Sequence, residues 1–152
     1  MRLTDSEAPL TEDQIASFEG ELGLRFPESL KAHYLRANGG YPDVSVYYDD
    51  EDDENVGVAL QYCLPLHGGK STAPLFYRNL VVRQSVVPKS FFPFAIDPGG
   101  DVLFVDASSE DGQVYLWHHD TAFDPIVPFK VGLDDFWSRL KPDAPDGSDV
   151  VQ

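Results

Sequence analysis

The tripeptide Asn38-Gly39-Gly40 separates two segments with different hydrophobic patterns. Before it, apolar residues recur every three or four positions, which is the spacing of one face of an α-helix. After it, residues 44–48 are mostly β-branched or aromatic, and such residues favour strands. Asparagine and glycine also tolerate the left-handed backbone conformations at which helices end. We therefore expect the chain to change from helices to strands at this tripeptide.

Two short helices are predicted before the tripeptide. The first begins after Thr11, which forms a capping box with Gln14, and it ends at Gly23. The second includes Pro27 in its first turn, because the N–H that proline lacks is not needed there. Only the short link 23–26 separates the two helices. The sequence therefore predicts an αα-hairpin.

The predicted strands all lie after the two helices, and a final helix follows them. Predicted strands and apolar stretches lie at 44–48, 56–66, 92–96, 102–107 and 114–118. A helix over 75–84 is supported only by the spacing of Phe76 and Leu80, and a final helix is predicted over 134–141. Strands grouped together, with helices at both ends, favour an α+β fold over a doubly wound parallel sheet.

The chain is strongly acidic. It contains 26 Asp and Glu against 11 Lys and Arg, for a net charge of −15. Nucleic acids and anionic membranes are polyanions, so this charge argues against binding either one and favours a basic partner. With 152 residues, 42% of them apolar, the chain fits one domain over 1–141 and a flexible acidic tail over 142–152.

Several features point to the cytoplasm. Cys63 is the only cysteine and cannot form an internal disulfide, so a reducing compartment is expected. The N-terminal residues lack the apolar region of a signal peptide, and no stretch approaches 18 apolar residues. We therefore predict a cytoplasmic protein with no membrane partner.

Motifs for nucleotide or metal binding are incomplete. The sequence Gly68-Gly69-Lys70-Ser71 would need a glycine at position 64 to be a P-loop, and that residue is Leu64. The acidic run at 49–54 lacks the glycine and the glutamate of a calcium loop. His118 and His119 are adjacent on a predicted strand, where successive side chains point to opposite faces. We therefore predict no metal site and no cofactor.

Catalytic motifs are also missing. The sequence contains no Gly-x-Ser-x-Gly nucleophile elbow. Cys63 lies in an apolar run, which favours an inert buried thiol. Asp97 and Asp101 flank a Pro-Gly-Gly turn, where aspartate is common. The sequence therefore predicts no enzyme and no catalytic residues.

The most distinctive feature is a run of six acidic residues that follows two tyrosines. The run is either a solvated loop that aids solubility or a contact for a basic partner. Tyrosine and tryptophan often anchor interfaces, while a charged surface mainly raises the association rate. The candidate partner-binding residues are Tyr47, Tyr48, Asp49, Asp50, Glu51, Asp52, Asp53, Glu54, Trp117 and His119.

Four blocks of the sequence together match a known family pattern. The first block has Leu-Gly at 22–23, Phe-Pro at 26–27 and Asn-Gly-Gly at 38–40. The other blocks are 94–106, 112–120 and 133–140. In this pattern the chain resembles the SUKH superfamily, which includes bacterial immunity proteins and a fungal cell-wall-synthesis regulator. Together these blocks span roughly residues 10–141. The run at 49–54 is not part of the family pattern.

The resemblance implies a central, mainly antiparallel sheet of about five or six strands. The helical hairpin and the C-terminal helix would pack around this sheet. It implies no catalytic residues, and it gives Glu19 the role of bonding buried backbone groups. Taken with the charge, it favours an immunity protein that is a monomer or weak dimer and that neutralises a cognate basic, nuclease-like toxin of a polymorphic toxin system. The alternative is a non-enzymatic regulatory or scaffold module.

Overall fold

The two predicted N-terminal helices are present. The structure, a computed structural model, describes residues 1–48 and 57–142. Helix α1 (Glu12–Leu22) has the complete Thr11–Gln14 capping box, and Gly23 ends it with a left-handed φ of 70°. Helix α2 (Glu28–Arg36) follows Pro27. This confirms the predicted helical hairpin.

The link between these helices is held by Glu19. Its carboxylate oxygen Oε2 accepts a hydrogen bond of 2.6 Å from the backbone N–H of Phe26, a residue that is itself buried. This is the backbone-bonding role that the family resemblance implied. The hydrogen bond fixes the chain between the end of α1 and the start of α2.

A five-stranded antiparallel sheet forms the centre of the fold. Its strand order is β5-β6-β7-β8-β9, the same as the order along the chain. The strands are β5 (Tyr62–Cys63), β6 (Phe91–Ile96), β7 (Val102–Asp106), β8 (Gln113–Trp117) and β9 (Ile126–Gly132). Sheet and helices together confirm the predicted α+β fold.

Two smaller strand pairs accompany the sheet. Strand β1 (Leu3–Thr4) pairs with β2 (Tyr41–Pro42), and β3 (Val46–Tyr48) pairs with β4 (Gly57–Ala59), both antiparallel. The backbone of Lys141 also forms a bridge with Val46. The chain segment after the last helix is therefore tied back to β3.

The segment after the loop at 68–72 is helical, but its geometry differs from the prediction. Helix α3 (Ala73–Phe76) continues into η1 (Tyr77–Arg83), whose turns are those of a π-helix. Its inward face is formed by Tyr77 and Val81, which are buried, whereas Leu75 is exposed. Phe76 and Leu80, whose spacing predicted this helix, are only partly buried, so its inward face lies one position further along the chain.

Near the C-terminus the structure differs from the prediction at two elements. Helix α4 (Leu133–Ser138) ends earlier than the predicted helix over 134–141. Strand β9 was not predicted, because Pro128 interrupts its apolar pattern. Proline has no N–H to donate, and it is tolerated here because β9 is an edge strand of the sheet.

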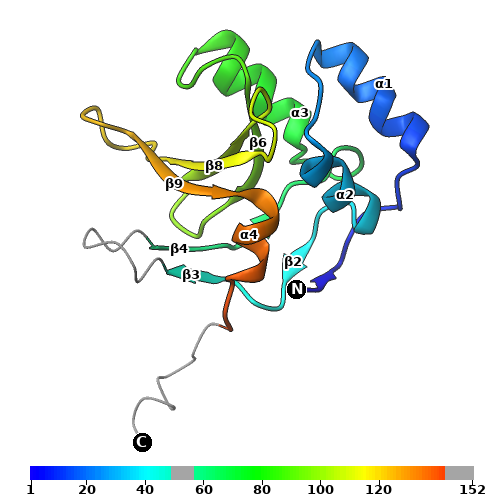
Figure 1. The fold of residues 1–152 in the computed structure, drawn as a ribbon. Coiled ribbons are helices and arrows are strands. Elements are labelled where there is room, and N and C mark those ends of the chain that lie inside the picture. The colour runs from blue at the N-terminus through cyan, green and yellow to red at the C-terminus, as the bar shows by residue number, and fades with distance from the viewer. Residues whose placement is uncertain (49–56, 143–152) are drawn as a thin grey trace, which may run out of the picture.

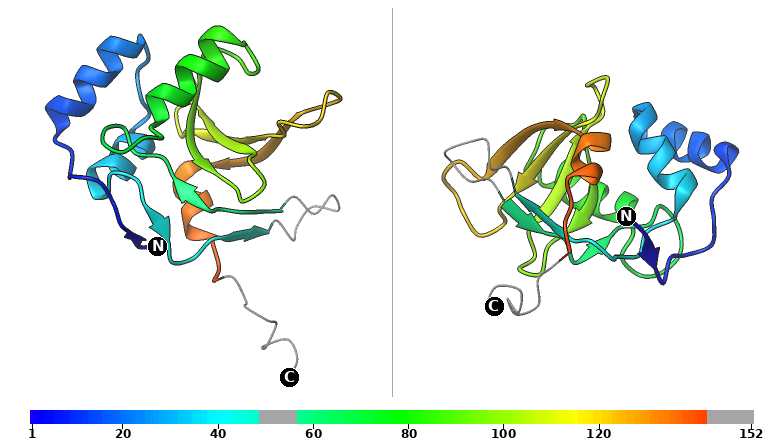
Figure 2. Two further views of the ribbon diagram at one scale, coloured as in Figure 1. Left: turned by 180° about the vertical axis from the view of Figure 1, so that it is seen from behind. Right: turned by 60° about the horizontal axis from the view of Figure 1, so that its bottom comes forward.

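The core is rich in aromatic residues and lies between the sheet and the helices. Its largest fully buried side chains include Tyr34, Tyr47, Phe26, Phe92, Phe94, Phe104, Phe129 and Phe136. Helices α1 and α2 lie together at one end of the molecule (Figure 1). The β8–β9 hairpin and the β3–β4 pair extend at the opposite end, as the further views confirm (Figure 2). The fold thus has a helical end and a hairpin end.

Asn38 joins three parts of the chain. Its side-chain Nδ2 donates to the carbonyl oxygens of Ala8, at 2.9 Å, and His67, at 3.0 Å. Its Oδ1 accepts from the backbone N–H of Leu66, at 2.9 Å. The next residue, Gly39, has a φ of 75°, and a Cβ there would lie 2.7 Å from the backbone of Pro65. Helix α2 already ends at Arg36, and its C-cap Ala37 is extended. The Asn-Gly-Gly sequence therefore serves packing, and the expectation that its left-handed residues end the helix is wrong.

Candidate functional site

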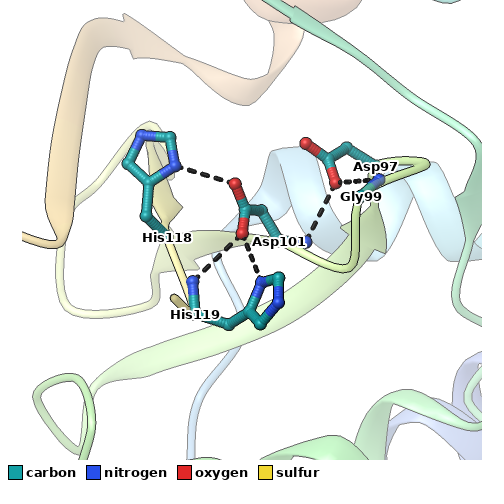
Figure 3. A network of polar contacts seen from close by, with 5 residues as sticks. All are labelled: Asp97, Gly99, Asp101, His118 and His119. Atoms are coloured by element: carbon teal, nitrogen blue, oxygen red, sulfur yellow. Dashed lines mark hydrogen bonds and ion pairs between the residues drawn. The ribbon is translucent and has the colours of Figure 1, made fainter. Parts of the chain in front are cut away.

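The pairing of β7 with β8 brings together the turn between β6 and β7 and the loop between β8 and β9, at the hairpin end of the molecule. Val102, the first residue of β7, is paired with Trp117, the last residue of β8. Asp101 therefore lies beside the residues that follow β8, although they are distant in sequence. Figure 3 shows the result, with His118 and His119 on either side of the Asp101 carboxylate.

Both histidine rings contact this one carboxylate. The Nδ1 atom of His118 lies 2.7 Å from Oδ2 of Asp101, and the Nδ1 atom of His119 lies 2.6 Å from Oδ1. The backbone N–H of His119 also donates to Oδ1, at 3.0 Å. Strand β8 ends at Trp117, so the alternation of a strand does not hold for the two histidines. Both rings instead reach one carboxylate from different sides, each at its own oxygen.

The turn that carries Asp101 is itself held by Asp97. The Asp97 oxygen Oδ1 accepts from the backbone N–H groups of Gly99 and Asp101, each at 2.9 Å. Between them, Gly100 has a φ of 98° and approaches the His119 ring, so that a Cβ there would lie 3.3 Å from the ring carbon Cε1. The turn at 97–101 therefore packs closely against the ring of His119.

These contacts shift the acid–base equilibria of the network. Burial opposes ionisation of Asp101, but the hydrogen bonds from the His119 backbone and from both rings outweigh it, so the pKa of this carboxyl is lowered. The hydrogen bond to Asp101 raises the pKa of His119. The lowered pKa favours the ionised form of Asp101, so both rings contact a negatively charged carboxylate.

Asp120 adds a further carboxylate to the group. One ligand atom each from Asp101, His119 and Asp120 lies within 4.8 Å of the others. Imidazole nitrogen and carboxylate oxygen are ligands that divalent metal ions accept. The described residues could therefore hold a cation at a place where the sequence predicted none.

An exposed aromatic side chain lies in the same loop. Phe123, in the segment that joins β8 to β9, is 83% exposed. Trp117 is half-buried, and its ring centroid lies 6.5 Å from that of His119. We call residues 97–101 and 117–125 together the hairpin surface. Sequence reasoning missed Phe123, although its position in a turn-rich segment beside Asp124 and Pro125 was a signal that it lies outside the core.

The remaining predicted partner-binding residues lie outside the two ranges that define the hairpin surface. Tyr47 is fully buried, and its ring stacks against Phe129 and Phe136 with centroid distances of 5.1 and 4.9 Å. It therefore belongs to the core and does not offer its ring to a partner. The side chain of Tyr48 and all of Asp49–Glu54 lie outside the described residues. Of the predicted partner-binding residues, Trp117 and His119 lie on the hairpin surface.

Cys63 has the inert character that its neighbours predicted. Its side chain is fully buried on β5, and burial raises the pKa of its thiol to about 12. The thiolate is the reactive form of cysteine. Cys63 is therefore unsuited to nucleophilic chemistry at neutral pH.

A comparison with protein families identifies the chain. The model of the SMI1 / KNR4 family (SUKH-1) matches residues 9–138. The chain belongs to this family. This confirms the resemblance seen in the sequence blocks. The chain has no significant match among curated proteins or among solved structures.

Membership in SUKH-1 is consistent with an immunity or a regulatory module, and SUKH domains act in protein–protein interaction. The family match covers both the helical hairpin and the hairpin surface of this SUKH chain. Among the described residues, no helix is long and apolar enough to cross a membrane.

Proposed function

We propose that this SUKH chain is an immunity protein that binds a cognate basic toxin in the cytoplasm and neutralises it by occlusion. The family match supports an immunity or regulatory role. The net charge of −15 supports a basic partner, because opposite charges favour encounter and orientation. A nuclease is the simplest basic toxin, since its substrate is a polyanion.

The hairpin surface carries this proposal. It contains the four carboxylates of Asp97, Asp101, Asp120 and Asp124 and no lysine or arginine. In the same loop as Asp120 and Asp124, the side chain of Phe123 is almost wholly exposed. An exposed apolar anchor on a surface whose charges all have one sign is suited to a partner with a hydrophobic pocket rimmed by basic residues.

Occlusion needs no chemistry from the immunity protein. Carboxylates of the hairpin surface would pair with the lysines or arginines that hold phosphate in a nuclease. Phe123 and Trp117 would bury apolar area beside these pairs. A toxin covered in this way cannot admit its substrate, so binding and inhibition are the same event.

The acidic run Asp49–Glu54 remains a second proposed part of the interface. The strands that flank it, β3 and β4, extend at the same end of the molecule as the β8–β9 hairpin (Figure 1). We leave Tyr47 out of the interface because its ring is in the core.

Co-expression with neighbouring open reading frames tests the proposal. The chain should rescue cells from the toxicity of one of them, and the purified pair should form a complex. Phe123→Ser should weaken that complex at least about tenfold, as expected for an interface anchor. Val82→Ser is the matched control, because Val82 is also exposed, at 57%, but lies on η1 and not on the hairpin surface.

Replacing Asp49–Glu54 with serine and asparagine tests the acidic run separately. The association rate should fall, and its dependence on salt should become weaker. An unchanged rate and an unchanged salt dependence would remove the run from the interface. If no neighbouring frame is toxic and the chain instead binds a host protein, it is a regulatory or scaffold module.

A further inference from the structure

We propose that Asp101, His119 and Asp120 form a binding site for Zn²⁺ on the hairpin surface. The site shares carboxylates with the proposed toxin interface, but zinc binding requires neither a toxin nor the immunity function. One ligand atom from each of the three residues lies within 4.8 Å of the other two. The three residues come from two turns, and they meet only because β7 and β8 are paired.

Hydrogen bonds hold two of the three ligand residues in place. Asp101 directly precedes the sheet residue Val102, and its backbone N–H donates to Asp97 at 2.9 Å. The backbone N–H of His119 donates to the Asp101 carboxylate at 3.0 Å, which links the two turns. Because Asp101 and His119 need little ordering when the metal binds, less of the binding free energy is lost.

The ligand types favour Zn²⁺ among common divalent ions. Zinc accepts imidazole nitrogen and carboxylate oxygen, whereas Ca²⁺ and Mg²⁺ prefer oxygen ligands throughout. Three protein ligands leave a coordination position for water or for a group from another molecule. The surrounding carboxylates, and the net charge of −15, also attract cations to this surface.

His118 has a supporting position in this arrangement. Its ring contacts Oδ2 of Asp101, while His119 contacts Oδ1. A metal taken up on the His119 side would leave the His118 contact in place. His118 is therefore a positioning residue, which orients the Asp101 carboxylate as outer-shell hydrogen bonds do in metal sites.

Zinc bound here would connect the β6–β7 turn to the β8–β9 loop by a coordination bond. The loop carries Phe123, so the metal would restrain the exposed aromatic side chain. The predicted effect is a local ordering of residues 120–125 when zinc is present.

The test is titration of the chain with Zn²⁺ alone, followed by calorimetry and by NMR of the histidine rings. To remove diffuse binding at the acidic run, all chains carry serine and asparagine at 49–54. We expect one Zn²⁺ per chain and a shift of the His119 ring signals. His119→Gln or Asp120→Asn should weaken binding more than about 100-fold, and His118→Gln about 10- to 100-fold.

His67→Gln is the matched control, because His67 is exposed but lies outside the hairpin surface. Its zinc affinity should equal that of the parent chain. Circular dichroism checks that each variant is folded. Absence of zinc binding, or equal affinity of the parent chain and the folded His119→Gln and Asp120→Asn variants, would overturn the proposal. Because no toxin is needed, failure here leaves the immunity function untouched, and the reverse also holds.

Discussion

Asn38 and His33 are both buried polar residues, but their surroundings differ. The amide of Asn38 bonds to backbone groups of Ala8, Leu66 and His67. His33 is 1% exposed, and neither of its ring nitrogens has a hydrogen-bond partner among the described residues. Its ring instead stacks on Trp137 at a centroid distance of 4.9 Å. One residue therefore contributes through hydrogen bonds, and the other as a neutral aromatic ring.

Asn38→Ala should lower the free energy of unfolding by about 3 kcal/mol or more, because it leaves two buried carbonyls and one N–H without their partners. Chemical denaturation of the two chains measures the difference. Asn79→Ala is the control, since the side-chain hydrogen bond between Asn79 and Arg83 is exposed, and it should change stability by less than about 0.5 kcal/mol. Equal effects of the two substitutions would contradict the role given to Asn38.

The burial of His33 predicts a loss of stability in acid. Burial, and then the charge of Arg36, lower the pKa of this ring from 6.5 to about 3. Between these values the unfolded chain binds a proton that the folded chain excludes. Stability should therefore decrease as the pH falls from 6.5 toward 3, with this residue contributing about 1.4 kcal/mol per pH unit.

The variant His33→Phe isolates that contribution. It keeps an aromatic ring against Trp137 but has no group that titrates. Urea unfolding of both chains across this pH range should give a shallower decrease for the variant. The many carboxylates titrate in both chains, so their effect cancels in the difference. Parallel curves would show that His33 is protonated in the folded state.

At the scale of elements, α1 depends on its N-cap. The Thr11 side chain accepts from the backbone N–H of Gln14, and the Gln14 side chain accepts from the backbone N–H of Thr11. Thr11→Ala should lower the free energy of unfolding by about 1 kcal/mol, as measured by denaturation. Thr121→Ala, in the exposed β8–β9 loop, is the comparison and should have little effect. A larger loss at Thr121 than at Thr11 would contradict the assignment.

Elements with local signals could be predicted from the sequence, and those that depend on distant contacts could not. The capping box and Gly23 mark both ends of α1, so its bounds followed from the sequence. Strand β9 contains Pro128, and only its position at the sheet edge makes a strand possible there. The π-helical turns of η1 place Tyr77 and Val81 inward, and no local pattern indicated this.

The same distinction applies to the candidate site. Trp117 and His119 were predicted as partner-binding residues, but the contact of His119 with Asp101 follows from the register of β7 and β8, which pairs Val102 with Trp117. Tyr47 was predicted to be an interface residue because it precedes the acidic run. The structure instead packs it between Phe129 and Phe136, which lie on β9 and α4. The position of Tyr47 next to the acidic run therefore did not indicate whether its side chain on β3 is exposed.

At the scale of the whole molecule, the net charge of −15 affects stability as well as binding. Like charges repel more strongly in the compact state, and salt screens them. Raising the ionic strength from about 0.01 to about 0.15 M shortens the Debye length from about 30 to about 8 Å. The thermal midpoint should therefore rise with salt over this range, as scanning calorimetry can measure.

Neutralising residues 49–54 should reduce that salt effect, because six neighbouring negative charges are then removed. An uncharged osmolyte at matched osmolality controls for effects other than screening. A midpoint that falls with salt would mean that favourable ion pairs outweigh repulsion. The described ion pairs of lysine and arginine, Lys31–Glu28 and Arg78–Glu21, each include an exposed carboxylate and are at most weakly stabilising.

The strand order of the sheet has a consequence for the kinetics of folding. From β6 to β9 each strand pairs with the next one along the chain, so these contacts close short loops. Such pairs can form one after another with little entropy loss, and local contacts favour rapid folding. The contacts of Asn38 to residues 8, 66 and 67 join more distant segments. The helical end is therefore expected to dock after the four strands have assembled.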